Sequence, residues 1–176
     1  TAALFAAACC GAGLLHQSPA DQTDGLYHYG MNLGIAFQLA DDLLDYAGDP
    51  SQTGKNVGDD LREGKITLPL LHAMKAGTPA QRDRVAEVLR QKEGDAFAEI
   101  IEIVRHTGGI EATRAAAMHH QALAQAALAP LPEERRTEQV GNEPGARAID
   151  EELSKRPPES TGETIPTYSE EVVSRR

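Results

Sequence analysis

Most of this chain alternates apolar and polar residues with the spacing of helices. A run of small apolar residues over 2–15, AALFAAACCGAGLL, predicts a helix that packs closely on its neighbours. Pro19 then marks a turn, and Asp21 or Asp24 is a suitable N-cap for a second helix over about residues 26–47. Because apolar residues surround this second helix almost completely, we expect it to be central in the fold.

The pattern stays helical up to residue 132. It predicts a helix that starts near Ile66 with a proline in its first turn, an amphipathic pair over 79–92 and 95–106, and an Ala-rich helix over 110–129. The sequence therefore predicts an all-α domain over residues 1–132.

The character of the chain changes beyond this domain. Residues 133–176 are rich in charge and proline, and large apolar residues such as Val140 and Ile149 are scattered singly. A segment without an apolar face cannot bury enough surface to offset its conformational entropy. We expect 133–176 to be a disordered polar tail, or to hold one short exposed helix.

Charge and cysteine content restrict the possible ligands and the cellular compartment. The formal net charge of −10 argues against binding nucleic-acid phosphates and favours cations as ligands. Cys9 and Cys10 are adjacent, so on a helix their side chains diverge by about 100° and should not pair, which fits the cytoplasm. No apolar run approaches the length that spans a bilayer, so we expect no integral membrane segment.

Three carboxylates interrupt the apolar second helix. Asp41 and Asp45 are one turn apart on one face, and Asp42 lies about 100° round from Asp41. Because no Lys or Arg is nearby, a cation should relieve their repulsion. Hard oxygen ligands at low density, with room for water and phosphate oxygens, favour Mg²⁺. The alternative is a solvated helix face, on which such acidic strings are common.

Two glycines share the stripe that carries Asp41. Gly30 and Gly34 either leave an apolar space above the carboxylates, suited to an apolar substrate, or allow another helix to pack closely. The sequence does not separate these two interpretations.

A glycine-punctuated loop follows the acidic helix and carries Lys55 and Lys65. If these lysines converge with Mg²⁺, the expected ligand is a diphosphate, since its charge needs both kinds of neutralisation. An apolar stripe beside it suggests an apolar tail. These features indicate cleavage of a C–O bond to diphosphate, with positive charge developing on an allylic carbon.

The segments FQLADDLLDY and GKNVGDDLREGKITLPLLHA resemble the second aspartate-rich motif and the downstream loop of trans-prenyl (polyprenyl) diphosphate synthases. The resemblance covers about residues 1–132 and implies the isoprenoid synthase helical bundle. It implies that Asp41 and Asp45 help to bind Mg²⁺ on an allylic diphosphate, that Asp42 supports them, and that Lys55 and Lys65 contact the diphosphate or close over it.

The resemblance also implies the surroundings of the reacting carbon. Phe37 and Gln38 would lie beside the allylic group, where the carbonyl dipole of Gln38 stabilises the cation. Thr1 matches the threonine of the family's Lys-Thr pair. Isopentenyl diphosphate would be the second substrate, the product a long-chain polyprenyl diphosphate for a quinone side chain, and the full-length enzyme a homodimer.

Two features of the family have no counterpart in these 176 residues: a first aspartate-rich motif and a basic pocket for isopentenyl diphosphate. The polar tail also differs from the family's apolar closing helix. We therefore expect the C-terminal half of a synthase, inactive alone. A non-catalytic helical partner subunit and a terpene cyclase-like fragment are the alternatives. His119 and His120 diverge on a helix and are interpreted as surface histidines, not as a metal pair.

Overall fold

A computed structural model describes residues 1–47, 58–91 and 94–133. All regular elements in these ranges are helical, which confirms the predicted all-α class. In chain order they are α1 (Ala2–Leu15), α2 (Ala20–Ala47), α4 (Asp59–Arg62), α5 (Leu68–Ala76), α6 (Pro79–Gln91), the 3₁₀ turn η1 (Gly94–Ala96), α7 (Phe97–His106) and α8 (Gly109–Ala127).

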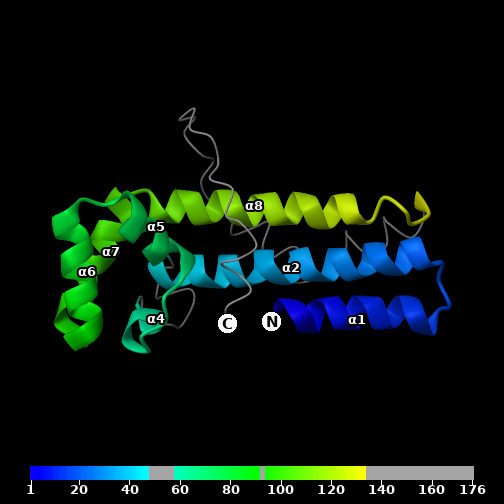
Figure 1. Cartoon of the computed structure of the whole chain (residues 1–176), viewed down its shortest axis with the longest axis horizontal. Coiled ribbons are helices and arrows are strands. Elements are labelled where there is room, and N and C mark those ends of the chain that lie inside the picture. Colours follow the sequence, from blue (N-terminus) through cyan, green and yellow to red (C-terminus); the bar gives the residue numbers. More distant parts are fainter. Residues whose placement is uncertain (48–57, 92–93, 134–176) are drawn as a thin grey trace.

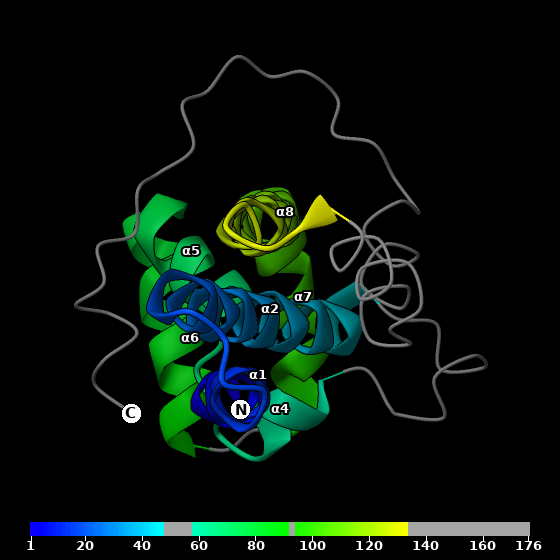
Figure 2. The ribbon, with the colours of Figure 1, turned by 90° about the vertical axis from the view of Figure 1, so that its right-hand side faces the viewer.

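Helix α2 is the centre of the fold, as its nearly continuous apolar surface predicts. Helices α1 and α8 lie along its two sides, so that three long helices form a stack (Figure 1). Viewed along the axes of these helices, α2 lies between α8 and α1 (Figure 2). The shorter helices α4 to α7 gather at the end of α2 that carries the acidic motif.

Glycines bring α1 against α2. A Cβ atom on Gly30 would lie 2.5 Å from the carbonyl oxygen of Phe5, and one on Gly34 would lie 2.6 Å from Cα of Ala2. Both distances are shorter than any real Cβ contact, so only glycine permits this approach. Of the two interpretations of these glycines, close helix packing is therefore the one that the structure shows.

The buried core has three parts, and α2 contributes to all of them. The largest joins α4, α5, α6 and α7 to the end of α2 and includes Tyr46, Leu61, Leu70, Val88 and Ile100, all nearly inaccessible to solvent. Two smaller parts lie between α2 and α8: Ala36, Ala40, Leu43 and Ala117 at the middle, and Leu26, Tyr29, Ala124, Leu128 and Leu131 at the other end.

Two local predictions need correction. Helix α2 starts at Ala20, more than one turn before the expected start, so Asp21 lies in its first turn and Asp24 inside it, and neither is an N-cap. The N–H of Thr23 donates to the carbonyl of Pro19, which shows that the helix starts directly after this proline. The part of the expected loop after residue 57 contains the short helix α4.

Other expectations concern the cysteines, membrane segments and residues outside the described ranges. Neither Cys9 nor Cys10 forms a disulfide bond. Among the helices of the described residues, none has the length and apolar character needed to cross a membrane. Lys55 and, from residue 134 on, the polar tail fall in ranges that the structure does not describe, so the division at residue 132 stays a prediction.

Candidate active site

A chain of side-chain hydrogen bonds joins α1 to the acidic motif. The hydroxyl of Thr1 donates to Oε1 of Gln38 over 3.1 Å, and Nε2 of Gln38 donates to Oδ1 of Asp42 over 3.0 Å. Asp42 is only 8% exposed, so its partner on α2 also offsets part of the cost of its burial. The structure thus brings together three residues that the sequence placed in one site.

Phe37 lies beside this chain of hydrogen bonds. Its ring is 5.7 Å from the ring of Phe5 on α1, with the two planes tilted by 32°. Phe37 remains 39% exposed, so an apolar surface borders the polar chain without closing over it. Such a border is suited to contact with an allylic or other apolar group.

Asp45 is buried and turned toward the segment after α2. Its Oδ1 accepts from the N–H of Asp59 over 3.0 Å, and its Oδ2 accepts from the N–H of Asp60 over 3.3 Å. Burial raises the pKa of the Asp45 carboxyl to about 6. The charges of Asp60 and Asp59 also raise this pKa, whereas the hydrogen bonds from their N–H groups lower it.

Asp41 is more exposed than Asp42 and Asp45, since it is half-buried on the same helix. It is therefore the carboxylate that an ion carrying its own waters and a phosphate ligand can reach most easily. Within residues 1–47, 58–91 and 94–133, no three His, Cys, Asp or Glu side chains are grouped so that they could hold a metal ion. Water and ligand oxygens would have to complete the coordination of any ion bound here, which suits Mg²⁺.

Asp60 connects Lys65 to the acidic motif. Its ammonium lies 3.0 Å from Oδ1 of Asp60 and 2.8 Å from Oε2 of Glu63. The hydrogen bonds to Glu63 and then to Asp60 raise the pKa of Lys65, so it is a cation at neutral pH. Because its side chain is exposed, a phosphate could take the place of either carboxylate at modest cost.

Asp60 is the residue that the sequence left without a role. It connects Asp45, which accepts its N–H, to Lys65, which donates to its carboxylate. The available signal was Gly58 followed by two acidic residues, the pattern of a helix start. Gly58, which directly precedes this helix, has a left-handed conformation with φ of 87°.

The histidine pair differs in part from its interpretation. His119 is exposed, as expected, but His120 is half-buried, and its Nδ1 lies 2.9 Å from Oδ1 of Asn32 on α2. His120 therefore joins two helices instead of lying freely on the surface.

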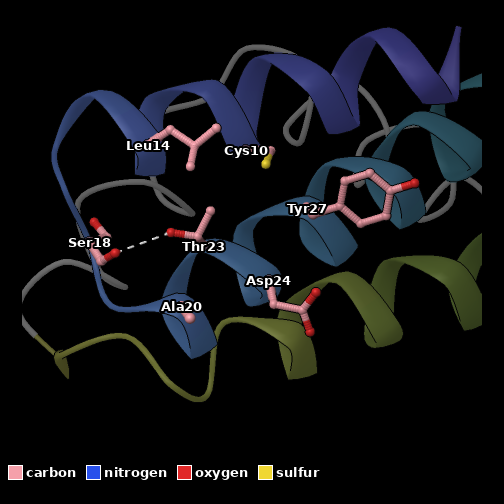
Figure 3. A pocket seen from close by; sticks show the side chains of 7 residues that line it. All are labelled: Cys10, Leu14, Ser18, Ala20, Thr23, Asp24 and Tyr27. Carbon is pink, nitrogen blue, oxygen red and sulfur yellow. Dashed lines mark hydrogen bonds between the residues drawn. The ribbon is translucent and has the colours of Figure 1, made fainter.

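An open hollow of about 570 Å³ lies where α1 turns into α2 (Figure 3). Its lining includes Cys10 and Leu14 from α1 and Thr23, Asp24 and Tyr27 from α2. Asp41 lies fourteen positions after Tyr27 on the same helix, a distance of about 21 Å along the axis. The hollow is therefore distinct from the acidic motif.

Comparison with known proteins decides the family. The sequence profile of the polyprenyl synthetase family matches residues 1–105, more than half of the chain. This chain belongs to the polyprenyl synthetase family. The predicted resemblance and fold are thereby confirmed, and the cyclase alternative is disfavoured.

Octaprenyl diphosphate synthases are among the relatives. The protein of Escherichia coli (strain K12) is 48% identical over 134 residues, which cover 76% of this chain and 42% of that protein. The protein of Haemophilus influenzae is 40% identical over 134 residues, or 76% of this chain and 41% of that protein. The chain thus spans less than half the length of these members of the polyprenyl synthetase family.

Solved structures of the polyprenyl synthetase family show the same arrangement of helices. Polyprenyl synthase from Caulobacter crescentus CB15, complexed with calcium and isoprenyl diphosphate, superposes with a TM-score of 0.72 at 35% identity. The match covers 88% of this chain and 46% of that one. Decaprenyl diphosphate synthase from Rhodobacter capsulatus gives 0.72 at 38% identity, over 87% and 46%. That the match is to the C-terminal half of the fold stays a prediction.

Proposed function

We propose that this chain supplies one side of the active site of a prenyltransferase that condenses isopentenyl diphosphate with an allylic diphosphate to give a long-chain polyprenyl diphosphate. The observation that supports it is the convergence on one stretch of α2: Thr1 meets Gln38, Gln38 meets Asp42, and the turn that carries Lys65 is tied to Asp45. A polyprenyl product would serve as a quinone side chain.

Charge neutralisation is the first requirement of this reaction. Asp41, with Asp42 beside it, would hold Mg²⁺, which would supply positive charge to the departing diphosphate. Lys65 would neutralise a diphosphate oxygen, and Lys55, which lies outside the described residues, is proposed for the same role. Lys65 already contacts two carboxylates, so binding a diphosphate oxygen would exchange one anion for another.

Stabilisation of the allylic cation is the second requirement. The Oε1 atom of Gln38 carries partial negative charge and is held by the hydroxyl of Thr1. The hydrogen bond from Nε2 to Asp42 fixes which way the amide points, so its oxygen stays turned toward Thr1. Phe37 and Phe5 would exclude water from the reacting carbon, because a free allylic cation is otherwise captured by water.

The described part of the chain has no complete active site of its own, so we expect no elongation of farnesyl diphosphate by the purified chain with isopentenyl diphosphate and Mg²⁺. Supplying the part of the E. coli octaprenyl diphosphate synthase that this chain does not match, joined in cis, should produce elongation. Incorporation of radiolabelled isopentenyl diphosphate into product measures both. Robust elongation by the chain alone would contradict the proposed partial site.

Asp41→Ala should lower the activity of the joined protein by about 10²-fold or more, since it removes a metal ligand that acts in the transition state. Asp24→Ala is the control, because Asp24 is an exposed carboxylate on the same helix, far from the motif. Equal activity of Asp41→Ala and the parent would remove Asp41 from the metal site.

The complete protein is proposed to be a cytoplasmic homodimer.

A second candidate function is that of a non-catalytic partner subunit, favoured by α1. This helix has no charged residue, and only Ala6 and Gly13 are buried, whereas Leu4 and Leu15 are 74% and 88% exposed. Such a surface suits packing against further helices of a synthase. If this function is the true one, the activity of the joined or assembled protein will survive Asp41→Ala.

A further inference from the structure

Asp45 binds three consecutive main-chain N–H groups of the segment that begins at Gly58. Its carbonyl oxygen accepts from Gly58 over 3.0 Å, and its two carboxylate oxygens accept from Asp59 and Asp60. The residue is only 9% exposed. The carbonyl oxygen and both carboxylate oxygens of Asp45 therefore accept hydrogen bonds from one short stretch of backbone.

These N–H groups have no acceptor inside their own helix. The first four N–H groups of any α-helix lack an intrahelical partner, and α4 has only four residues, Asp59–Arg62. Gly58 precedes it and has no side chain that could cap it. Asp45, at the end of α2, therefore takes the part that an N-cap side chain usually plays.

The turn that Asp45 holds also places a cation. The carboxylate of Asp60 accepts from Nζ of Lys65, and the N–H of Lys65 donates back to the carbonyl of Asp60 over 2.8 Å. Leu61, in the same turn, is 2% exposed and packs in the core with Tyr46. A displacement of the N–H groups of Asp59 and Asp60 would therefore move Lys65.

We propose that Asp45 is a positioning residue, which anchors α4 and through Asp60 sets the place of Lys65, and not a direct metal ligand. Both carboxylate oxygens already face N–H groups at hydrogen-bond distance, and the buried location leaves little access for a hydrated ion. The effect on diphosphate binding rests on the proposed function, whereas the anchoring of α4 does not.

Amide hydrogen exchange of the full chain, measured by NMR without metal or substrate, tests the anchoring. The amides of Asp59 and Asp60 should be protected in the parent. They should exchange about fivefold or more faster in Asp45→Ala, and by a smaller factor in Asp45→Asn, which keeps one acceptor oxygen. Asp24→Ala is the matched control and should change neither rate. Equal exchange in the parent and in both Asp45 variants would overturn the proposal.

The amides around Ala117 in α8 report whether the whole fold is intact, since this residue is fully buried far along the chain. If Asp45→Ala also loses protection there, Asp45→Asn decides the test. Faster exchange confined to residues 59–65 supports the anchoring role.

Titration with inorganic diphosphate at several Mg²⁺ concentrations separates positioning from metal binding. Asp45→Asn should weaken diphosphate binding at saturating Mg²⁺ by about threefold or more without changing the Mg²⁺ concentration at half-saturation, whereas Asp41→Asn should raise that concentration. A rise in the Mg²⁺ requirement of Asp45→Asn equal to that of Asp41→Asn would make Asp45 a ligand and overturn the proposal. If even the parent does not bind Mg²⁺ and diphosphate, the proposed function fails, and the exchange experiment still decides the anchoring.

Discussion

At the scale of single residues, polar groups between helices are matched by specific partners. Asn32 shows how such a match also sets the tautomer of a histidine. Its Nδ2 donates to the carbonyl of His28 over 2.9 Å, so its Oδ1 is the atom that faces Nδ1 of His120. An amide oxygen can only accept, and Nδ1 of His120 must therefore carry the proton. Burial, and then the neighbouring His119, lower the pKa of His120.

This lowered pKa predicts a loss of stability on acidification. Between the folded pKa and the ordinary value near 6.5, the unfolded chain binds more protons than the folded one, so the free energy of unfolding falls as the pH drops through this window. Urea unfolding at pH 7.5 and 5.5 should show a larger loss for the parent than for His120→Gln, which cannot titrate. His16→Gln, at an exposed site, is the control. Equal losses in the parent and His120→Gln would contradict this role.

At the scale of elements, the pairing of α1 with α2 depends on backbone contact. Gly30 and Gly34 let α1 approach α2 so closely that main-chain atoms of Phe5 and Ala2 lie 2.5 and 2.6 Å from the places where Cβ atoms would be. The same contact brings Thr1 to Gln38 and Phe5 to Phe37. The glycines thus act on the candidate site from a distance, through the position of one helix.

Gly30→Ala should therefore destabilise the chain by about 1–3 kcal/mol, because the new methyl group meets backbone that cannot move without shifting α1. In a helix without such a contact, the same change should stabilise by about 0.5–1 kcal/mol. Gly11→Ala on α1 is the matched control, since a Cβ there meets nothing within 4 Å. Denaturant unfolding measures both, and the expected result is opposite signs. Stabilisation by both changes would refute the close packing.

At the scale of the whole molecule, the three long helices are unequally covered. Helix α2 is packed on two sides by α1 and α8 (Figure 2), whereas α1 packs mainly on α2. Three leucines of α1 are exposed to solvent: Leu4, Leu14 and Leu15. Exposed apolar area of this kind is typical of a surface that another protein segment covers. The chain spans less than half the length of the octaprenyl diphosphate synthases that it matches.

Replacing the exposed leucines of α1 should make the chain less prone to associate. The triple variant Leu4→Gln, Leu14→Gln and Leu15→Gln should reduce self-association in size-exclusion chromatography with light scattering, and should change the free energy of unfolding by less than about 1 kcal/mol. Leu43→Ala, at a fully buried position, should instead cost about 2–5 kcal/mol. Unchanged self-association of the triple variant would show that the chain does not associate through α1.

Apolar periodicity and local chain breaks determined the elements of this protein. The helix over 2–15, most of the central helix and the helices between residues 66 and 129 follow from spacing that needs no knowledge of neighbours. The start of the central helix at Ala20 and the short helix α4 did not follow from it. The choice of Asp41, Gln38 and Lys65 as a site also came from the sequence, through charges placed in apolar surroundings and a resemblance.

Contacts between distant segments could not be predicted in the same way. Whether Gly30 leaves a space or admits a helix depends on where α1 lies, and the role of Asp45 depends on backbone N–H groups that follow it by more than a dozen residues. Helix periodicity is local because it arises from bonds four residues apart, whereas burial and hydrogen-bond partners arise from the packing of whole helices. The sequence therefore places the three aspartates on one helix, and only the folded chain assigns Asp42 to Gln38 and Asp45 to α4.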